Sequence, residues 1–319
     1  MSTIRISKKA LFFFFYLAKY RSINLAYLFS YFNVSEKDVE GLKFKNGLLE
    51  VINNGNKISI SHLPTFGFSM TMLIRLLKSN RIKILDCQSS FFIAQTGDMT
   101  FKVQSLSNMA VLYEIFVEDI YSFATSKKDL IVVDIGMNVG LASMYFASKS
   151  NVLHVYGYEP FPETYHEATS NFSLNPNIFE KVSLINAGVS DISEFRKIYL
   201  FESGLLSAST IDTINHYGKI KDTFVEVKLI SIKSVLDMVK LNHPNKPILM
   251  KIDCEGEEYA IFEALKNSDY FNNVDCIMVE WHENGYCNIE SILLNNQFQI
   301  YHKYHVSENS GMIYAYKSF

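Results

Sequence analysis

Short apolar runs alternate with segments of helical spacing from residue 130 to the end of the chain. A β-α-β alternation of this kind requires a mostly parallel sheet with helices on both faces. We therefore predict an α/β, Rossmann-like domain built on a seven-stranded sheet. The expected strands cover residues 130–134, 153–158, 182–186, 248–253, 274–280, 298–304 and 312–316, and the expected helices cover residues 139–148, 162–174, 257–265 and 288–294.

Residues 197–230 interrupt this alternation. Two apolar runs, at 197–201 and 224–229, predict an inserted strand pair, and a polar stretch at 202–210 separates them. Loops at the carboxyl ends of strands form the binding sites of this architecture. We expect the insertion to contact substrate, with Ser207 and Ser209 as candidate contacts.

The first 105 residues lack the alternation and predict a separate α+β region with a helical start and two hairpins. The hairpins are expected at residues 48–60 and 91–103, with a helix at 68–78 between them. At 319 residues and 48% hydrophobic content, the chain is long enough for such a region beside a larger domain at 106–319. A helical pattern from residue 108 to about 123 opens that larger domain.

Basic residues precede an aromatic-rich apolar run near the N-terminus, at residues 10–18. This run is less than half of the ~20 residues that cross a bilayer, and no convincing cleavage site follows it. With residues 23–34 it predicts a buried or docking helix pair. A segment in the membrane interface and a signal sequence are the alternatives.

Composition limits the partners and the compartment. A formal net charge of −3 and a pI near 6.3 give no general attraction to nucleic acid, so we expect no nucleic-acid partner. The four cysteines lack C-x-x-C spacing and are interpreted as reduced thiols, which favours the cytoplasm. Membrane association through the N-terminus stays open.

The first expected strand runs into a glycine-containing turn that contains Asp134, Gly136, Asn138 and Gly140. Such a strand-to-helix turn brings backbone N–H groups and the positive end of a helix toward a polar ligand. The dinucleotide pattern G-x-G-x-x-G is absent, and an acid here suits an ammonium group better than a pyrophosphate. The turn therefore favours S-adenosyl-L-methionine as cofactor. An ordinary tight connection is the alternative.

The next two strands also end in polar residues. Glu159 ends the second strand, where an acid accepts hydrogen bonds from ribose hydroxyls. Asn186 ends the third strand, where it is expected to face the adenine, although asparagine is also a common turn residue.

Four segments together resemble the FkbM family of S-adenosylmethionine-dependent methyltransferases: 134–140, 158–162, 251–258 and 279–282. The resemblance extends over roughly residues 108–316. The chain departs from the usual family residues at Met137, Cys254 and Glu257, which are neighbours of the motif positions. The resemblance implies a class I methyltransferase fold, a cofactor site that includes Pro160, and O-methylation of a hydroxyl on a polyketide, glycan or glycolipid.

A second group of polar residues follows the fourth and fifth expected strands: Lys251, Asp253, Glu255, Glu258, Glu280 and His282. Adjacent parallel strands would bring them together at the rim of the cofactor site. Methyl transfer to a hydroxyl benefits from close positioning and from a general base. His282 and Asp253 are the candidate bases, and Asp253 is also a candidate cofactor contact. Lys251 requires an acid partner, for which Glu280 is the candidate.

Glu255 and Glu258 complete this group as candidate substrate contacts. The alternative is an ion-pair network that only shapes the rim. We assign no metal ligand from the sequence, and a divalent cation on the clustered carboxylates is a minority interpretation. For the protein as a whole, we expect methylation of a glycan or glycolipid hydroxyl. A small secondary metabolite as acceptor and a non-catalytic cofactor-binding scaffold are the alternatives, and the sequence does not indicate an oligomeric state.

Overall fold

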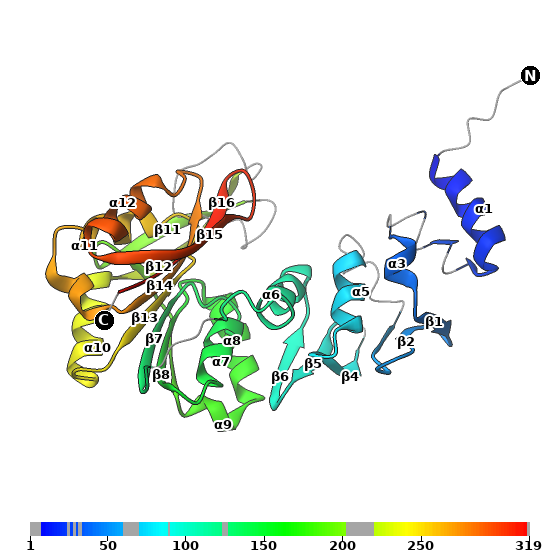
Figure 1. Cartoon of the computed structure of the whole chain (residues 1–319), viewed down its shortest axis with the longest axis horizontal. Coiled ribbons are helices and arrows are strands. Elements are labelled where there is room, and N and C mark those ends of the chain that lie inside the picture. Colours follow the sequence, from blue (N-terminus) through cyan, green and yellow to red (C-terminus); the bar gives the residue numbers. More distant parts are fainter. Residues whose placement is uncertain are drawn as a thin grey trace, which may run out of the picture. The chain divides into compact units, whose positions relative to one another are not determined.

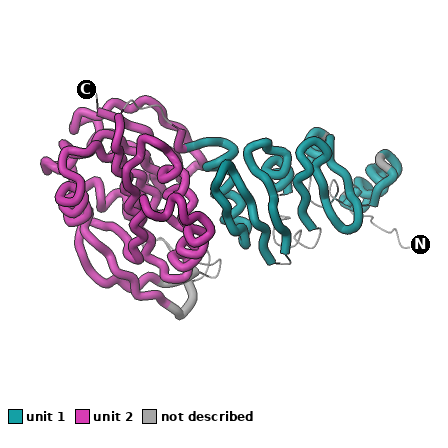
Figure 2. The backbone as a smooth tube through the Cα atoms, turned by 90° about the horizontal axis from the view of Figure 1, so that it is seen from below, with its two compact units in different colours: residues 1–120 teal, residues 121–319 magenta. Residues whose placement is uncertain are grey.

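The computed structural model describes residues 8–23, 26–27, 30, 34–59, 70–88, 90–122, 127–201 and 220–317. The chain divides into two compact units, Met1–Ile120 and Tyr121–Phe319 (Figure 2). Sequence analysis placed the boundary after residue 105. The helix α6 (Leu106–Phe116), expected to open the second domain and to run to about residue 123, ends at Phe116 and groups with the first unit.

The first unit contains two three-stranded antiparallel sheets, β1-β2-β3 and β4-β5-β6. Both expected hairpins are present, as β2/β3 and β5/β6, and each carries one further strand that was not predicted. The elements are α1 (Lys8–Tyr20), α3 (Glu36–Val39), β1 (Leu42–Lys45), β2 (Leu48–Val51), β3 (Lys57–Ser59), α5 (Met70–Lys78), β4 (Lys83–Cys87), β5 (Phe92–Thr96), β6 (Met99–Val103) and α6.

A buried asparagine ties the two sheets of this unit together. Asn56 is 3% exposed, and its Nδ2 donates to the carbonyl oxygens of Leu77 (2.8 Å) and Ile82 (2.7 Å). Its Oδ1 accepts from the backbone N–H of Ile84 at 2.9 Å. Three backbone groups at the end of α5 and the start of β4 are thus satisfied by one side chain, where an unpaired buried group would be costly.

The second unit is organised around a seven-stranded sheet of order β15-β16-β14-β13-β7-β8-β9. Strands β9, β8, β7, β13 and β14 are parallel, and β16 is antiparallel to both β14 and β15. This confirms the predicted fold. The strands are β7 (Leu130–Ile135), β8 (Val152–Tyr158), β9 (Val182–Ile185), β13 (Ile248–Ile252), β14 (Cys276–His282), β15 (Phe298–His305) and β16 (Ser310–Lys317).

Helices cover both faces of this sheet (Figure 1). One face carries α7 (Leu141–Ala147), α8 (Pro162–Ser173) and α9 (Pro176–Phe179); the other carries α10 (Ile232–Asn242), α11 (Glu258–Leu265), the short 3₁₀ helix η4 (Asp269–Asn273) and α12 (Cys287–Asn295). The main core lies under the second group, where apolar side chains of α10, α11 and α12 pack on β7, β13 and β14.

Helix α10 was not predicted, although its signal is present in the sequence. The side chain of Ser231 accepts a hydrogen bond from the N–H of Ser234 and caps the helix. Ile232, Val235 and Val239 follow at helical spacing and are buried.

The inserted strands form a second sheet of order β10-β12-β11. The predicted strand pair is present: β11 (Glu194–Phe201) and β12 (Ile220–Ser231) pair antiparallel, and β10 (Gly188–Ser190) adds to β12 in parallel. Ser207 and Ser209 lie outside the described residues.

The connectivity of the main sheet places a ligand site. The chain builds outward from β7 through β8 to β9 and then crosses to β13, on the other side of β7. Ligands of open α/β sheets bind at the carboxyl ends of the strands where the order reverses in this way. Here that point lies between β7 and β13.

Candidate active site at the carboxyl ends of the strands

The glycine turn after β7 is held against β13. Gly136 has φ 77°, and a Cβ atom built on it would lie 1.7 Å from the carbonyl oxygen of Asp253. The N–H of Asp253 donates to the carbonyl of Ile135 at 3.0 Å. Asn138 has φ 54°, and its Oδ1 accepts from the N–H of Val139 at 2.7 Å. Gly140, with φ 87°, precedes α7 directly. A side chain at Gly136 would therefore push the two strand ends apart.

Glu159 connects this turn to the end of β8. Its two carboxylate oxygens accept from the backbone N–H groups of Asn138 (3.1 Å) and Phe161 (3.0 Å). The residue is 5% exposed, and burial raises the pKa of the carboxyl to about 7 against the smaller opposing effect of these hydrogen bonds. Each carboxylate oxygen has two lone pairs, so acceptor capacity for a ligand remains.

Asn186 supports the backbone beside Glu159. Its Nδ2 donates to the carbonyl oxygens of Glu159 (2.9 Å) and Pro160 (3.3 Å). Asn186 is exposed, and its expected contact with adenine stays a prediction.

The partner of Lys251 differs from the expected one. Lys251 and Asp134 are register neighbours on β13 and β7, and their charged groups lie 3.1 Å apart with both side chains buried. Lys251 also lies 3.4 Å from Asp253 and donates to the carbonyl of Gly136 at 2.7 Å. Burial alone would lower the pKa of Lys251, but the Asp134 carboxylate beside it raises that pKa well above its ordinary value.

This arrangement corrects two expectations. The acid partners of Lys251 are Asp134 and Asp253, where sequence analysis named Glu280. Asp134 was expected to receive the cofactor's ammonium, but its side chain is fully buried and already contacts the ammonium of Lys251. Its other oxygen accepts from Ser143 Oγ at 2.6 Å. Asp134 therefore orients Lys251 rather than a ligand.

The ends of β13 and β14 bring three of the predicted residues together. Asp253 follows β13, while Glu280 and His282 lie two apart on β14 and share a face. One donor atom of each, a carboxylate oxygen or a ring nitrogen, lies within 4.8 Å of the others. The predicted meeting of these two strand ends is present in the structure.

Glu258 has a different place from the expected one. It is fully buried at the start of α11, where it accepts from the backbone N–H groups of Gly256 (2.7 Å) and His282 (2.8 Å). The same carboxylate contacts His282 Nδ1 at 3.1 Å. Glu258 is therefore out of reach of a substrate and instead fixes the backbone and ring of His282.

Negative charge dominates the surroundings of His282. Glu255 and Glu280 lie 3.8 and 3.9 Å from its Nε2. Burial alone would lower the pKa of His282, but the hydrogen bond to Glu258 and the nearby carboxylates raise it to about 10. Burial and neighbouring acids raise the pKa of Glu255 to about 7, although the charge of His282 opposes them.

Tyr121 is a buried aromatic residue near the charged groups of this site. It is 4% exposed, and its ring centroid lies 6.5 Å from that of Tyr145 and 5.5 Å from that of Phe146. Burial raises the pKa of its hydroxyl well above the ordinary value. The nearby charge of Lys251 lowers this pKa, and that of Asp253 raises it.

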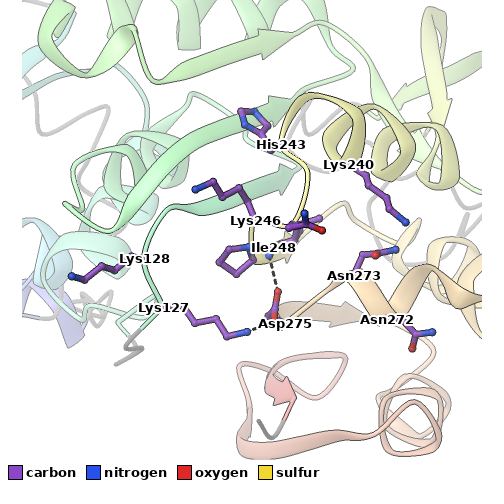
Figure 3. Close-up of a pocket in the computed structure, with 11 residues that line it drawn as sticks. Lys127, Lys128, Lys240, His243, Lys246, Ile248, Asn272, Asn273 and Asp275 are labelled. Atoms are coloured by element: carbon purple, nitrogen blue, oxygen red, sulfur yellow. Dashed lines mark hydrogen bonds and ion pairs between the residues drawn. The ribbon is translucent and has the colours of Figure 1, made fainter.

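A cavity of about 420 Å³ lies at the opposite edge of the sheet, around the amino ends of β13 and β14 (Figure 3). Lysines dominate its lining, and Asp275 contacts Lys127 and accepts from the N–H of Ile248 at 2.9 Å. None of the predicted site residues lines this cavity. It is distinct from the site at the carboxyl ends.

The comparison with protein families decides the assignment. A methyltransferase FkbM domain model matches residues 134–300, a span longer than half of the 319-residue chain. The chain belongs to the FkbM methyltransferase family. This FkbM domain contains the turn after β7, Glu159, Asp253 and the acidic cluster around His282, which consists of Glu255, Glu258 and Glu280.

Curated relatives of the FkbM protein are also methyltransferases. Methyltransferase sdnD of Sordaria araneosa is 23% identical over 227 residues, covering 63% of this chain and 85% of that protein. Hexuronic acid methyltransferase AglP of Haloferax volcanii is 21% identical over 207 residues, covering 65% and 76%. A solved FkbM methyltransferase from Methylobacillus flagellatus KT matches at 15% identity and a TM-score of 0.40, covering 64% of this chain and 48% of that one. The present chain thus spans about half of that solved structure.

Proposed function

We propose that this protein transfers a methyl group from S-adenosyl-L-methionine to a hydroxyl of a glycan or glycolipid. One observation carries the cofactor assignment: the Glu159 carboxylate accepts the N–H of Asn138, so that the glycine turn and the acid at the end of β8 form a single face. S-adenosyl-L-methionine carries a ribose next to its amino-acid end, and it fits this face because Glu159 retains acceptor capacity for the ribose hydroxyls.

The residues present fit this cofactor without Asp134. Backbone groups of Gly136, Asn138 and Gly140 would line it, and Glu159 would hold the ribose hydroxyls. Asp253 lies between the turn and the acidic cluster, and its side chain is 30% exposed. It would contact the methionine end of the cofactor on one side and the acceptor on the other.

The bound cofactor would supply a methyl group on a positively charged sulfur, which a hydroxyl oxygen can displace. The chain's task is then to hold the acceptor oxygen in line and to take its proton. We favour Asp253 as the proton acceptor, because His282 is only 11% exposed at its side chain and its Nδ1 is engaged by Glu258. Glu280 and Glu255, both partly exposed, would contact the acceptor.

The relative named as a hexuronic acid methyltransferase supports a sugar as acceptor. Labelled cofactor should be incubated with cell-envelope glycans and, separately, with a small-molecule extract. We expect label in the glycan fraction, and Asp253→Asn should abolish it while Glu180→Gln, on the exposed end of α9, should not. Label only in the small-molecule fraction would favour a secondary metabolite. Cofactor binding without any transfer would favour a scaffold.

We further infer a cytoplasmic location with peripheral contact to an anionic membrane through α1. No described helix is long and apolar enough to cross a bilayer. Helix α1 exposes Leu11, Phe12, Phe14 and Phe15 by 53–63%, and lysines lie at both of its ends. Exposed aromatic residues with flanking positive charge suit an anionic lipid surface.

Sedimentation with vesicles tests this contact. The protein should sediment with phosphatidylglycerol vesicles and stay in solution with phosphatidylcholine vesicles. Replacement of Phe12 and Phe15 by serine should abolish sedimentation, and no difference between the two lipids would argue against the inference.

A further inference from the structure

We propose that the lysine-lined cavity at the amino ends of β7, β13 and β14 binds a phosphate or diphosphate group, carried by a small molecule or by a lipid headgroup (Figure 3). Binding there does not depend on the proposed function, because this cavity and the cofactor turn lie at opposite edges of the main sheet. Its volume of about 420 Å³ lies within the roughly 300–1,000 Å³ of small-molecule sites. A cavity of this size can hold a phosphate-bearing group.

Positive charge is concentrated in the lining. Four of the eleven lining residues are lysines, and they come from separate parts of the second unit (Figure 3). Lys127 and Lys128 precede β7, Lys240 lies in the last turn of α10, and Lys246 precedes β13. Asp275 is the acidic residue of the lining. This local excess contrasts with the chain as a whole, whose formal net charge is −3.

Two of the four lysines are paired with acids. One carboxylate oxygen of Asp275 contacts Lys127, and the other accepts from the backbone N–H of Ile248 at 2.9 Å. Lys246 lies 2.7 Å from Asp129, which is outside the lining. Both oxygens of the lining acid are therefore engaged, and Asp275 cannot also neutralise the remaining two lysines.

Lys128 and Lys240 are those remaining lysines. In the described part of the chain, neither forms an ion pair or a side-chain hydrogen bond. Asp237, one turn before Lys240 on α10, accepts a hydrogen bond from the Tyr270 hydroxyl at 2.9 Å. Two ammonium groups are thus available to an anionic ligand, and lysine is a common phosphate-binding residue.

The state of His243 is a second sign of positive potential in the cavity. This lining residue has its Nε2 3.0 Å from the Tyr156 hydroxyl. Burial lowers the pKa of His243, and the charge of Lys246 lowers it further, although Lys246 is paired with Asp129. The ion pair therefore does not cancel the positive charge that His243 experiences.

The lining also offers neutral donors. Asn245 and Asn273 contribute side-chain amides, and within the described residues neither amide is engaged in a hydrogen bond. Ammonium and amide groups are hydrogen-bond donors, and a phosphate group presents several acceptor oxygens. The donor set therefore suits a phosphate or diphosphate group.

Calorimetry with inorganic pyrophosphate at low ionic strength tests the site. The intact protein should bind about one equivalent, as expected for one cavity of this size. Lys128→Gln and Lys240→Gln should each weaken binding about fivefold, and the double variant should weaken it by more than about tenfold. Lys233→Gln is the matched control, because Lys233 is an exposed lysine of α10 outside the lining. Equal affinities of the double variant and this control would overturn the site.

Nuclear magnetic resonance locates the ligand in the intact protein, without any variant. A bound anion stabilises the protonated imidazole, so pyrophosphate should raise the pKa of His243 in a pH titration of its ring signals. The ring signals of His302, on β15 and outside the lining, should not move. Heat of binding without a change at His243 would place pyrophosphate elsewhere and overturn the proposal.

Vesicle sedimentation distinguishes the two sources of the phosphate group. The variant with serine at Phe12 and Phe15 should be used, so that α1 does not contribute. Sedimentation with phosphatidic acid vesicles that is lost on adding Lys128→Gln and Lys240→Gln would assign a lipid headgroup. Pyrophosphate binding without such sedimentation would assign a soluble ligand, and the absence of both would overturn the proposal.

A competition experiment separates this site from the proposed function. Saturating S-adenosyl-L-methionine should leave the affinity for pyrophosphate unchanged, whereas competition would place pyrophosphate in the cofactor site and overturn the cavity as its binding site. Pyrophosphate binding in a protein that does not bind the cofactor would contradict the proposed function and leave the phosphate site standing.

Discussion

The backbone of Asp253 occupies the space that a side chain at Gly136 would need. A Cβ at Gly136 would lie 1.7 Å from the carbonyl oxygen of Asp253 and 2.8 Å from its carbonyl carbon. Gly136 is therefore needed for the close packing of β7 on β13, in addition to any contact it makes with a ligand. At this point the end of β7, which carries the glycine turn, meets the end of β13, which leads into the acidic cluster.

Gly136→Ala should destabilise the protein by at least about 3 kcal/mol, because a backbone clash adds to the strain of a left-handed residue. Gly285→Ala is the matched control, since Gly285 has φ 73° but no atom within 4 Å of the added Cβ. It should cost about 1–2 kcal/mol. Urea unfolding measures both, and equal losses would show that the contact with Asp253 is unimportant.

Lys251→Met and Asp134→Asn should each destabilise the protein by about 3–5 kcal/mol, since the first leaves the buried Asp134 carboxylate without its cation and the second leaves Lys251 with only the partly exposed Asp253. The double variant should lose clearly less than the sum of the two single losses, because neither charge then remains. Urea unfolding of all four proteins gives the coupling energy. Additive losses would mean that the 3.1 Å pair has no energetic coupling.

The affinity for S-adenosylmethionine should rise about tenfold between pH 6 and pH 8, if only ionised Glu159 accepts the ribose hydroxyls. Burial raises the pKa of Glu159 to about 7, so the carboxylate is mostly protonated at pH 6 and mostly ionised at pH 8. Calorimetry at both pH values measures the change. Glu159→Gln should bind weakly at both, and a pH dependence retained in that variant would assign the titration to another group.

Asn56→Ala should destabilise the first unit by about 2–4 kcal/mol, because it leaves backbone groups of Leu77, Ile82 and Ile84 without their partner. Asn54→Ala is the control: Asn54 also donates to Leu77, at 2.9 Å, but is less buried. It should cost less than about 1 kcal/mol. Hydrogen exchange of the Ile84 amide should accelerate only in the Asn56 variant.

Most of the second unit could be predicted from sequence, because buried parallel strands are continuous apolar runs bounded by turn residues. Strands β7, β13 and β14 are such cases, because they are buried over almost their whole length. Helix α10 was missed because it follows the insertion directly, where the alternation of strand and helix is no longer regular. In the first unit, β1 and β4 were missed because each is short, has at most one buried residue and depends on a neighbouring hairpin.

The sequence predicted where the candidate site lies better than it predicted which of the site's residues contact one another. Polar residues after β7, β8, β13 and β14 indicated one edge of the sheet, and the structure places them there. The partner of Lys251 depends on the order of strands, and Asp134 became its register neighbour only because β13 lies beside β7. Likewise, the contact of Glu258 with His282 joins a helix start to a strand end, which spacing along the chain does not reveal.

The pairing of β7 with β13 has a consequence for how the protein is made. These strands are neighbours in the sheet, yet the whole of β8, β9 and the inserted sheet separates them in the chain. Their contact therefore closes a long loop, which is entropically costly and slow to form. During synthesis, β7 has an open edge until residue 252 has left the ribosome. The proposed cofactor site needs the ends of both strands, so retention of nascent chains on an immobilised cofactor should begin only after residue 252 has been released.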